Sequence, residues 1–146
     1  MQIGVESARA VENKRIFVIE ADEIIRSALQ FMLHDENETH EMASLAQAYE
    51  KGCAWKPDLL LLGLSFVEEA GTGLIDEIKA RLPGAAILVV ADAPGHPLAE
   101  ACLAAGAKGV LAKPITIEGV RGKVDIVLGR RALPMVSLDA LAPAGR

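Results

Sequence analysis

The chain has few cysteines, no long apolar run and no excess of basic residues. Its two cysteines, Cys53 and Cys102, are too few for a disulfide framework and lack the CxxC spacing of a redox motif. No apolar run approaches the ~18 residues needed to cross a bilayer, and residues 1–14 lack the apolar core of a signal peptide. A net charge of -5 offers no basic surface to nucleic acid. We therefore expect a soluble cytoplasmic domain that binds neither nucleic acid nor membrane.

The 146 residues are enough for one folded domain. Hydrophobic residues make up 51% of the chain, which favours a packed core over disorder. Residues 1–13 show no clear periodicity and are expected to form a flexible arm. Residues 14–130 carry regular hydrophobic patterns. Residues 131–146, which contain two prolines, are expected to form a tail or a linker.

Short apolar runs alternate five times with helical patterns. Asp22, Ser44 and Thr116 are predicted N-caps, Pro97 suits the first turn of a helix, and Gly52 is expected to end one. The alternation is typical of a doubly wound parallel α/β sheet of the flavodoxin-like type, with helices on both faces and strand order 2-1-3-4-5. The polar second strand suits an edge position. The predicted strands are residues 16–19, 39–43, 59–62, 86–90 and 108–112, the predicted helices are residues 22–34, 44–52, 74–82, 97–106 and 116–128, and residues 65–73 are expected to form a loop.

The apolar run Leu59–Leu62 is predicted to be the central strand of this sheet. Pro57 stands before it and Gly63 directly after it. A continuous apolar run of this kind suits a strand that is buried on both faces. In an open parallel sheet, chemistry gathers beyond the carboxyl ends of the strands. The residue at that end is Gly63, which has no side chain to contribute.

Four landmarks, in this order, resemble the receiver domain of bacterial two-component response regulators. An acidic cluster at residues 20–23 follows the first strand, and a Pro-Asp-apolar strand occupies residues 57–62. Gly71 stands eight residues after Gly63, and residues 106–114 have the sequence GAKGVLAKP. The resemblance covers about residues 14–129.

The resemblance implies phosphoryl transfer from a histidine kinase to an aspartate at the end of the third strand. It also implies a magnesium ion, and a lysine and a hydroxyl residue that hold the phosphoryl oxygens. By position, the acceptor aspartate falls on Gly63, and the acid pair after the first strand falls on Glu20 and Ala21. Of the family's direct metal ligands, only the backbone carbonyl of Ser65 would remain, so no metal site is expected. The hydroxyl position falls on Ala91.

Of the four remaining positions that the resemblance assigns, two differ from the family and two match it. The small residue after the hydroxyl position falls on Asp92, and the aromatic switch position in the fifth strand falls on Val110. Lys113 and Pro114 match the family, in which the bond between them is often cis. We expect Lys113 to pair with Asp92 or Glu20. The acceptor aspartate, the metal-binding acid, the hydroxyl residue and the aromatic switch residue are all replaced. The chain therefore resembles a pseudo-receiver, a receiver domain that lacks the phosphoacceptor aspartate.

A pseudo-receiver of a two-component phosphorelay would signal by protein–protein interaction without aspartyl phosphorylation, and it would need no cofactor and perform no enzymatic reaction. Two other functions stay open. A flavodoxin-like protein could bind a small anionic ligand or a nucleotide, with Lys113 holding the anion and Gly63 making room for it. A conventional phosphorylated receiver could use Asp22 or Asp92 as a substitute acceptor, although Asp22 is expected to cap a helix.

Receivers of this family commonly dimerise or bind partners through the fourth helix, the fifth strand and the fifth helix. The matching surface spans residues 96–129, so the expected partner is another protein or a second copy of this chain. Its candidates for close packing are His96, Ala101, Ala104, Ala105, Gly119 and Gly122. Trp55 is expected to pack beneath the loop before the third strand. An exposed Trp55 would instead indicate a contact surface.

Overall fold

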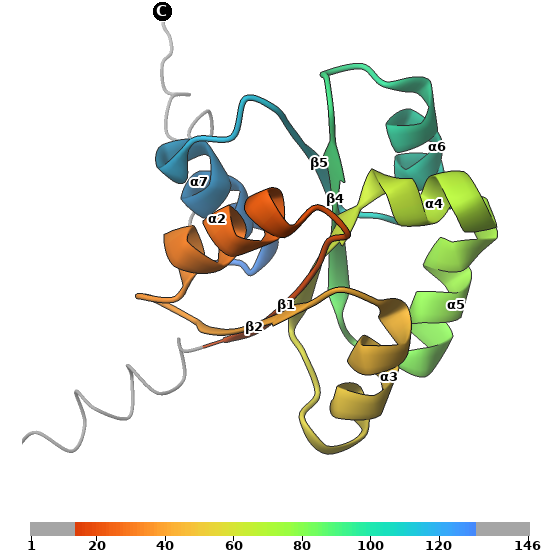
Figure 1. The fold of residues 1–146 in the computed structure, drawn as a ribbon. Helices are drawn as coiled ribbons and strands as arrows, with labels where there is room; N and C mark the ends of the chain where they lie inside the picture. The colour runs from red at the N-terminus through yellow and green to blue at the C-terminus, as the bar shows by residue number, and fades with distance from the viewer. Residues whose placement is uncertain (1–13, 131–146) are drawn as a thin grey trace, which may run out of the picture.

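The computed structural model describes residues 14–130, and the expected arm (1–13) and tail (131–146) lie outside the described residues. Five strands alternate with helices, as the sequence predicts (Figure 1). In chain order the elements are β1 (Arg15–Ile19), α2 (Glu23–Leu33), β2 (Glu38–Met42), α3 (Leu45–Ala54), β3 (Leu59–Gly63), α4 (Leu64–Ala70), α5 (Gly73–Arg81), β4 (Ala86–Ala91), α6 (Pro97–Ala105), β5 (Gly109–Ala112) and α7 (Ile117–Val127).

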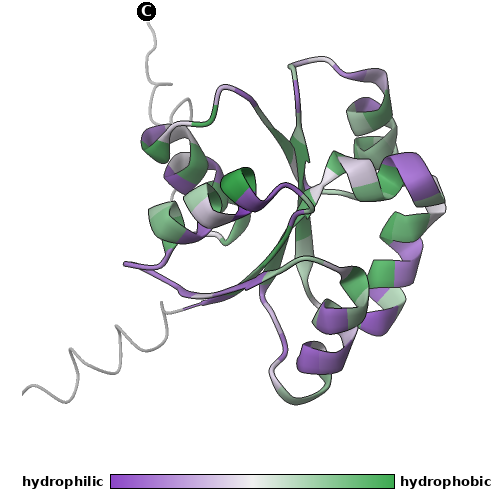
Figure 2. Ribbon diagram, viewed as in Figure 1, coloured by the Kyte–Doolittle hydropathy of each residue, from purple (hydrophilic) through white to green (hydrophobic). Residues whose placement is uncertain are grey.

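The five strands form one parallel sheet in the order β2-β1-β3-β4-β5, which confirms the predicted fold and topology. Helices α2 and α7 cover one face, and α3 to α6 cover the other (Figure 1). The central strands are hydrophobic along their length, whereas the helices mix hydrophobic and hydrophilic residues (Figure 2). None of the helices within residues 14–130 is long and apolar enough to cross a membrane.

Strand β3 divides its side chains between the two cores. Leu60 and Leu62 belong to the core beneath α3 to α6, whereas Leu59 and Leu61 belong to the core beneath α2 and α7. All four are 0% exposed. Complete burial of a leucine stabilises a fold by roughly 1.5–3 kcal/mol. A strand that faces two cores therefore needs an unbroken apolar run, which is what the sequence provides.

The three predicted N-caps are confirmed. Asp22 Oδ1 accepts hydrogen bonds from the backbone N–H groups of Ile24 (2.9 Å) and Ile25 (3.2 Å). Ser44 Oγ accepts from the N–H of Gln47 at 3.3 Å, and Thr116 Oγ1 accepts from the N–H of Gly119 at 3.0 Å. These contacts satisfy donors that the first turn of a helix leaves unpaired.

Three local predictions are wrong. Most of the segment expected to be a loop forms helix α4, because Leu64 and Val67, three residues apart, both turn into the core. Gly52 does not end α3 but lies buried inside it, where its missing side chain lets Leu82 approach. Trp55 is 48% exposed instead of packing beneath the following loop. Its ring lies beside the Arg15 guanidinium, 5.1 Å from the ring centre.

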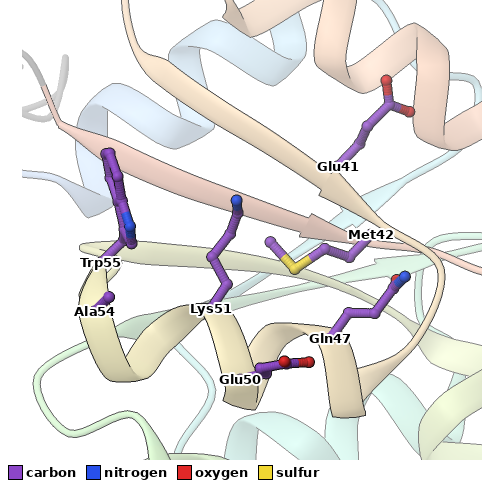
Figure 3. A pocket seen from close by; sticks show the side chains of 7 residues that line it. All are labelled: Glu41, Met42, Gln47, Glu50, Lys51, Ala54 and Trp55. Atoms are coloured by element: carbon purple, nitrogen blue, oxygen red, sulfur yellow. The ribbon is translucent and has the colours of Figure 1, made fainter.

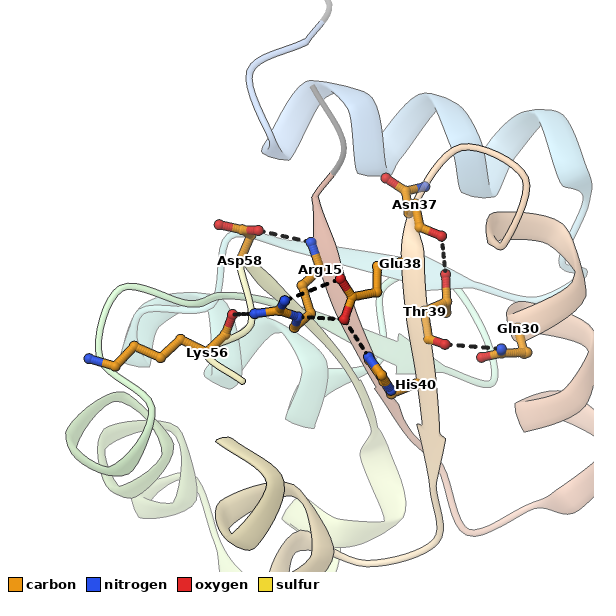
Figure 4. A network of polar contacts seen from close by, with 8 residues as sticks. All are labelled: Arg15, Gln30, Asn37, Glu38, Thr39, His40, Lys56 and Asp58. Atoms are coloured by element: carbon orange, nitrogen blue, oxygen red, sulfur yellow. Dashed lines mark hydrogen bonds and ion pairs between the residues drawn. The ribbon is translucent and has the colours of Figure 1, made fainter. Parts of the chain in front are cut away.

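The edge strand β2 is held by a polar network at its first residue (Figure 4). Arg15 donates from Nε (2.7 Å) and Nη2 (3.2 Å) to the carboxylate of Glu38, and His40 Nε2 lies 2.8 Å from the same carboxylate. Arg15 Nη1 also donates to the carbonyl of Lys56 at 3.1 Å. The hydrogen bonds from Arg15 and His40 lower the pKa of Glu38 from 4.5 to about 2.

This network predicts an acid-sensitive contribution to stability. The unfolded chain takes up a proton on Glu38 near pH 4.5, while the folded chain resists it down to about pH 2. The contribution of Glu38 to the free energy of unfolding should therefore be complete above pH 4.5. It should be lost as the pH falls towards 2. Urea unfolding of the wild type and Glu38→Gln across this range should show their free energies of unfolding converging. Glu69→Gln, on the exposed side of α4, is the control, and a wild-type advantage over Glu38→Gln that persists at the acid end would contradict the prediction.

Candidate functional site

A depression of about 260 Å³ lies beyond the carboxyl ends of the strands. Open parallel sheets place their ligand sites at this edge. Several positions that the sequence singles out meet there, including the segment after β1, the residue after β4 and the residue after β5. The lining residues are Glu20, Ala21, Asp22, Leu64, Ser65, Glu68, Val90, Asp92 and Lys113.

Glu20 is the most firmly held carboxylate of this site. The residue is 8% exposed, and its Oε2 accepts a hydrogen bond from the backbone N–H of Asp22 at 2.9 Å. Its backbone carbonyl accepts from Arg26 Nη1 at 2.7 Å, and its N–H donates to the carbonyl of Met42 at 3.2 Å. A buried carboxylate is costly unless it is hydrogen-bonded. These contacts fix both the backbone and the side chain of Glu20.

The Glu20 carboxylate lies directly over Gly63, the last residue of β3. A Cβ atom at position 63 would stand 2.6 Å from Glu20 Oε1, 2.9 Å from its Cδ and 3.0 Å from its Oε2. The backbone of Gly63 has φ -63° and ψ 136°, which every residue type adopts readily. A side chain at position 63 would therefore require the end of the Glu20 side chain to shift, while the backbone itself does not demand glycine. The carboxylate of the residue after β1 lies in the space beyond the end of β3.

Lys113 pairs with Asp92, which confirms one of the two predicted partners. Lys113 Nζ donates to Asp92 Oδ1 at 2.9 Å. This hydrogen bond raises the pKa of Lys113 and lowers that of Asp92, and Glu20 adds only a weaker attraction to Lys113. The side chain of Asp92 is 82% exposed, so solvent screens the pair and it adds little to the stability of the fold. The bond between Lys113 and Pro114 is cis, as predicted.

Of the other predicted positions, Asp22 and Ser65 bring polar side chains to the depression, and Ala21, Ala91 and Val110 bring none. Ala91 is 1% exposed at the end of β4, and Val110 packs against the core beneath α3 to α6. Ala21 carries only a methyl group. Asp22 uses its side chain to cap α2. Ser65 lies in the first turn of α4, at the rim.

Besides the apolar lining residues Leu64 and Val90, sequence analysis missed one polar lining residue and one residue that supports the site. Glu68 reaches the depression from α4, in the segment expected to be a loop. The spacing of Leu64 and Val67 was the available signal for that helix. Arg26 holds the backbone of Glu20 from the first turns of α2. No sequence pattern marks that contact.

The site does not fit the magnesium ion that the resemblance implies. Ala21 and Gly63 have no donor atom, Glu20 binds the backbone of Asp22, and Asp92 is paired with Lys113. Nowhere in residues 14–130 are three or more His, Cys, Asp or Glu side chains grouped as a metal ion requires. The histidines lie apart, in contacts of their own: His34 with Asp35, His40 with Glu38, and His96 at the start of α6.

A comparison with protein-family models identifies the family. The model of the response regulator receiver domain matches residues 16–125. The chain belongs to this family. Within this receiver domain, the matched range runs from β1 into α7, so it includes every strand of the sheet and every residue that lines the depression.

Individual relatives agree with this receiver fold. The transcriptional regulatory protein CitT of Bacillus subtilis is 36% identical over 66 residues, which are 45% of this chain and 29% of that protein. The chain thus spans less than a third of that relative. A response regulator from Thermotoga maritima has a TM-score of 0.72 at 19% identity, over 80% of this chain and 98% of that one. The beryllofluoride-activated NtrC4 receiver domain dimer has a TM-score of 0.69 at 22% identity, over 79% and 96%. At these identities the solved structures show the fold alone.

Proposed function

We propose that this receiver domain signals by contact with another protein and does not use aspartyl phosphorylation. The observation that carries the proposal is the Glu20 carboxylate over Gly63. The family resemblance places the acceptor aspartate at position 63, and the space that its side chain would need is taken by Glu20. The receiver fold is retained around a site in which an acceptor side chain would have to displace the Glu20 carboxylate.

The chemistry of phosphoryl transfer supports this proposal. The reaction needs a nucleophilic carboxylate, a cation that neutralises the developing charge, and donors to the phosphoryl oxygens. Lys113 is the single donor kept from that set, and Asp92 already binds it. The buried negative charge of Glu20 would repel an incoming phosphoryl group. We infer that the domain is a signalling module and not an enzyme.

The substitute acceptors and the anion-binding alternative are less well supported. Asp22 Oδ1 is engaged with two backbone N–H groups, and Asp92 is paired at the rim. Room for an anion beside Gly63 is the feature on which the alternative depends, and Glu20 occupies that room. Each substitute acceptor thus already has one carboxylate oxygen engaged, and an anion beside Gly63 would require the Glu20 side chain to shift.

The surface of residues 96–129 is the proposed partner surface. Leu103 on α6 is 36% exposed and Ile117 on α7 is 40% exposed, while Ile24, Phe31 and Trp55, outside this surface, are more exposed. Ala101, Ala104 and Gly119 are exposed beside them, and His96, Ala105 and Gly122 are partly buried. One of the similar structures is a receiver domain dimer. Sedimentation of the purified chain distinguishes a second copy from a different partner.

Incubation with acetyl phosphate and Mg²⁺, followed by mass measurement of the intact protein, tests the proposal. We expect no mass increase, with a conventional receiver in the same buffer as the positive control. A stoichiometric gain of about 80 Da, one phosphoryl group, that hydroxylamine removes would overturn it. The variants Asp22→Asn and Asp92→Asn would then show whether either carboxylate is the acceptor.

A further inference from the structure

The depression beyond the carboxyl ends of the strands carries an excess of negative charge. Four of its lining residues are acids and one is a lysine; the acids are Glu20, Asp22, Glu68 and Asp92. Lys113, the lysine, already binds Asp92. Arg26 lies close to the site, but it contacts the backbone carbonyl of Glu20 and the side chain of Glu41. Within residues 14–130, the other three carboxylates of the depression form no ion pair.

A larger groove between β2 and α3 has balanced charges and serves as a comparison (Figure 3). Its volume is about 510 Å³, and its charged lining residues are Glu41, Glu50 and Lys51. Arg26 Nε lies 3.5 Å from Glu41 Oε1, so this groove has as many cations as carboxylates. A cationic ligand is therefore attracted to the smaller depression and not to this groove.

Glu20 gives the depression a fixed hydrogen-bond acceptor. The residue is 8% exposed, and its Oε2 accepts from the backbone N–H of Asp22 at 2.9 Å. Its Oε1 has no hydrogen-bond partner within the part of the chain that the structure describes, although the side chain lines the depression. The position of this oxygen is set before a donor arrives. Such preorganisation lowers the cost of binding.

The arrangement of the acids favours a guanidinium over a metal ion. Among residues 14–130, no three of these carboxylates are grouped as a metal ion requires. A guanidinium presents five N–H donors in a planar fork, so it can bind carboxylates that one metal ion cannot bring together. Pockets for drug-sized ligands measure about 300–1,000 Å³. The depression, at about 260 Å³, suits a single side chain better than a whole metabolite.

Apolar surface beside the depression indicates that this guanidinium belongs to a protein. Ile24 stands two residues after Asp22 and is 79% exposed, the most exposed large hydrophobic side chain in residues 14–130. Arginine is enriched among the residues that carry the binding energy of protein interfaces, and apolar contacts around it exclude water. Lys113 lines the depression and also belongs to the proposed partner surface. A partner on that surface can therefore reach the depression.

We propose that the depression receives an arginine side chain of a partner protein. The guanidinium binds Glu20 Oε1 and the carboxylate of Glu68, and an apolar neighbour of the arginine packs on Ile24. This inference rests on the proposed function, because it names the chemistry of the contact through which the domain signals. Glu20 then has a role of its own: it takes the space of an acceptor aspartate and offers a hydrogen-bond acceptor to the partner.

The peptide acetyl-Leu-Arg-Leu-amide serves as the probe. Its control is the same peptide with citrulline, which has the shape of arginine without the charge. Each peptide is titrated into the ¹⁵N-labelled full chain at low salt, and the backbone amide shifts are followed. We expect the arginine peptide alone to shift the amides of Asp22 and Glu68 saturably. Added salt should weaken this binding, because the contact is between charges.

Three variants locate the binding. Glu20→Gln removes the charge but keeps an oxygen for the N–H of Asp22, and it should raise the Kd about tenfold or more. Glu68→Gln should raise the Kd as well, and because Glu68 is exposed, this variant keeps the fold. Glu69→Gln makes the same change of charge at an exposed position of α4 outside the depression, and it should leave the Kd unchanged.

Four results would overturn the inference. Equal shifts from both peptides would show that the charge of arginine plays no part. An equal Kd for the wild type, Glu20→Gln and Glu68→Gln would place the binding elsewhere. Free L-arginine that binds as tightly as the peptide would indicate a small-molecule site. Shifts of the same amides that grow with the concentration of the chain alone would show that a second copy fills the depression.

This experiment and the acetyl phosphate experiment can fail separately. A phosphoryl adduct would overturn the proposed function, whatever the peptides do. Absence of peptide binding without any adduct would overturn only the arginine contact and leave signalling without phosphorylation in place.

Discussion

Gly63→Asp is expected to destabilise the domain and not to restore phosphorylation. The new Cβ would stand 2.6–3.0 Å from the carboxylate of Glu20, so the buried Glu20 would have to move. Forcing extra atoms into a packed site costs typically about 1–3 kcal/mol. A second carboxylate beside the first adds repulsion. Urea unfolding at pH 7 should show a loss of this size in the free energy of unfolding.

Two further variants test whether contact with Glu20 causes this loss in the free energy of unfolding. Gly73→Asp makes the same chemical change at the first residue of α5, where no atom lies within 4 Å of the added Cβ, and should cost little. Glu20→Ala/Gly63→Asp removes the clash, so its loss should be smaller than the sum of the two single losses, with a coupling of about 0.5–3 kcal/mol. Strictly additive losses would mean that the two residues do not compete for space.

Phe17→Ala should cause a larger loss, about 3–5 kcal/mol in the free energy of unfolding. Phe17 is 0% exposed in β1, and its ring meets the edge of His40 at 5.8 Å. Truncation leaves a cavity that the surrounding strands cannot close. Because domains are stable by only about 5–15 kcal/mol, guanidinium unfolding should show a midpoint shift far outside error.

Phe31→Ala is the matched control for Phe17→Ala. The residue type and the truncation are the same, but Phe31 is 69% exposed on α2. Phe31→Ala should lower the free energy of unfolding by no more than about 0.5 kcal/mol. Similar losses at the two positions would contradict the burial on which the prediction depends.

The sheet was predictable from the sequence because its signals are local. The unbroken run Leu59–Leu62 indicated a strand with a core on each side, and the polar residues of the second strand indicated the edge. Asp22, Ser44 and Thr116 marked helix starts through side chains that act two or three residues away. Such patterns are written along the chain, so no knowledge of neighbours in space is needed.

The remaining features depend on contacts between residues far apart in the sequence. Gly63 could be recognised as lacking an acceptor side chain, but Glu20 above it could not, because nothing in the sequence says which way that carboxylate turns. Gly52 resembled a helix end and is a contact point for Leu82. Trp55 resembled a core residue, and the structure places it against Arg15 at the edge of the sheet. In each case packing outweighs local preference.

The contact between Glu20 and Gly63 also bears on how reversible this site is over evolutionary time. Two of the four glycine codons differ from an aspartate codon by a single nucleotide, and the other two differ by two nucleotides. An aspartate at position 63 meets a buried carboxylate that accepts a hydrogen bond from the N–H of Asp22, on a residue whose backbone carbonyl is bound by Arg26. An aspartate at position 63 should therefore be tolerated best where position 20 also changes, and we expect the two positions to vary together among related chains.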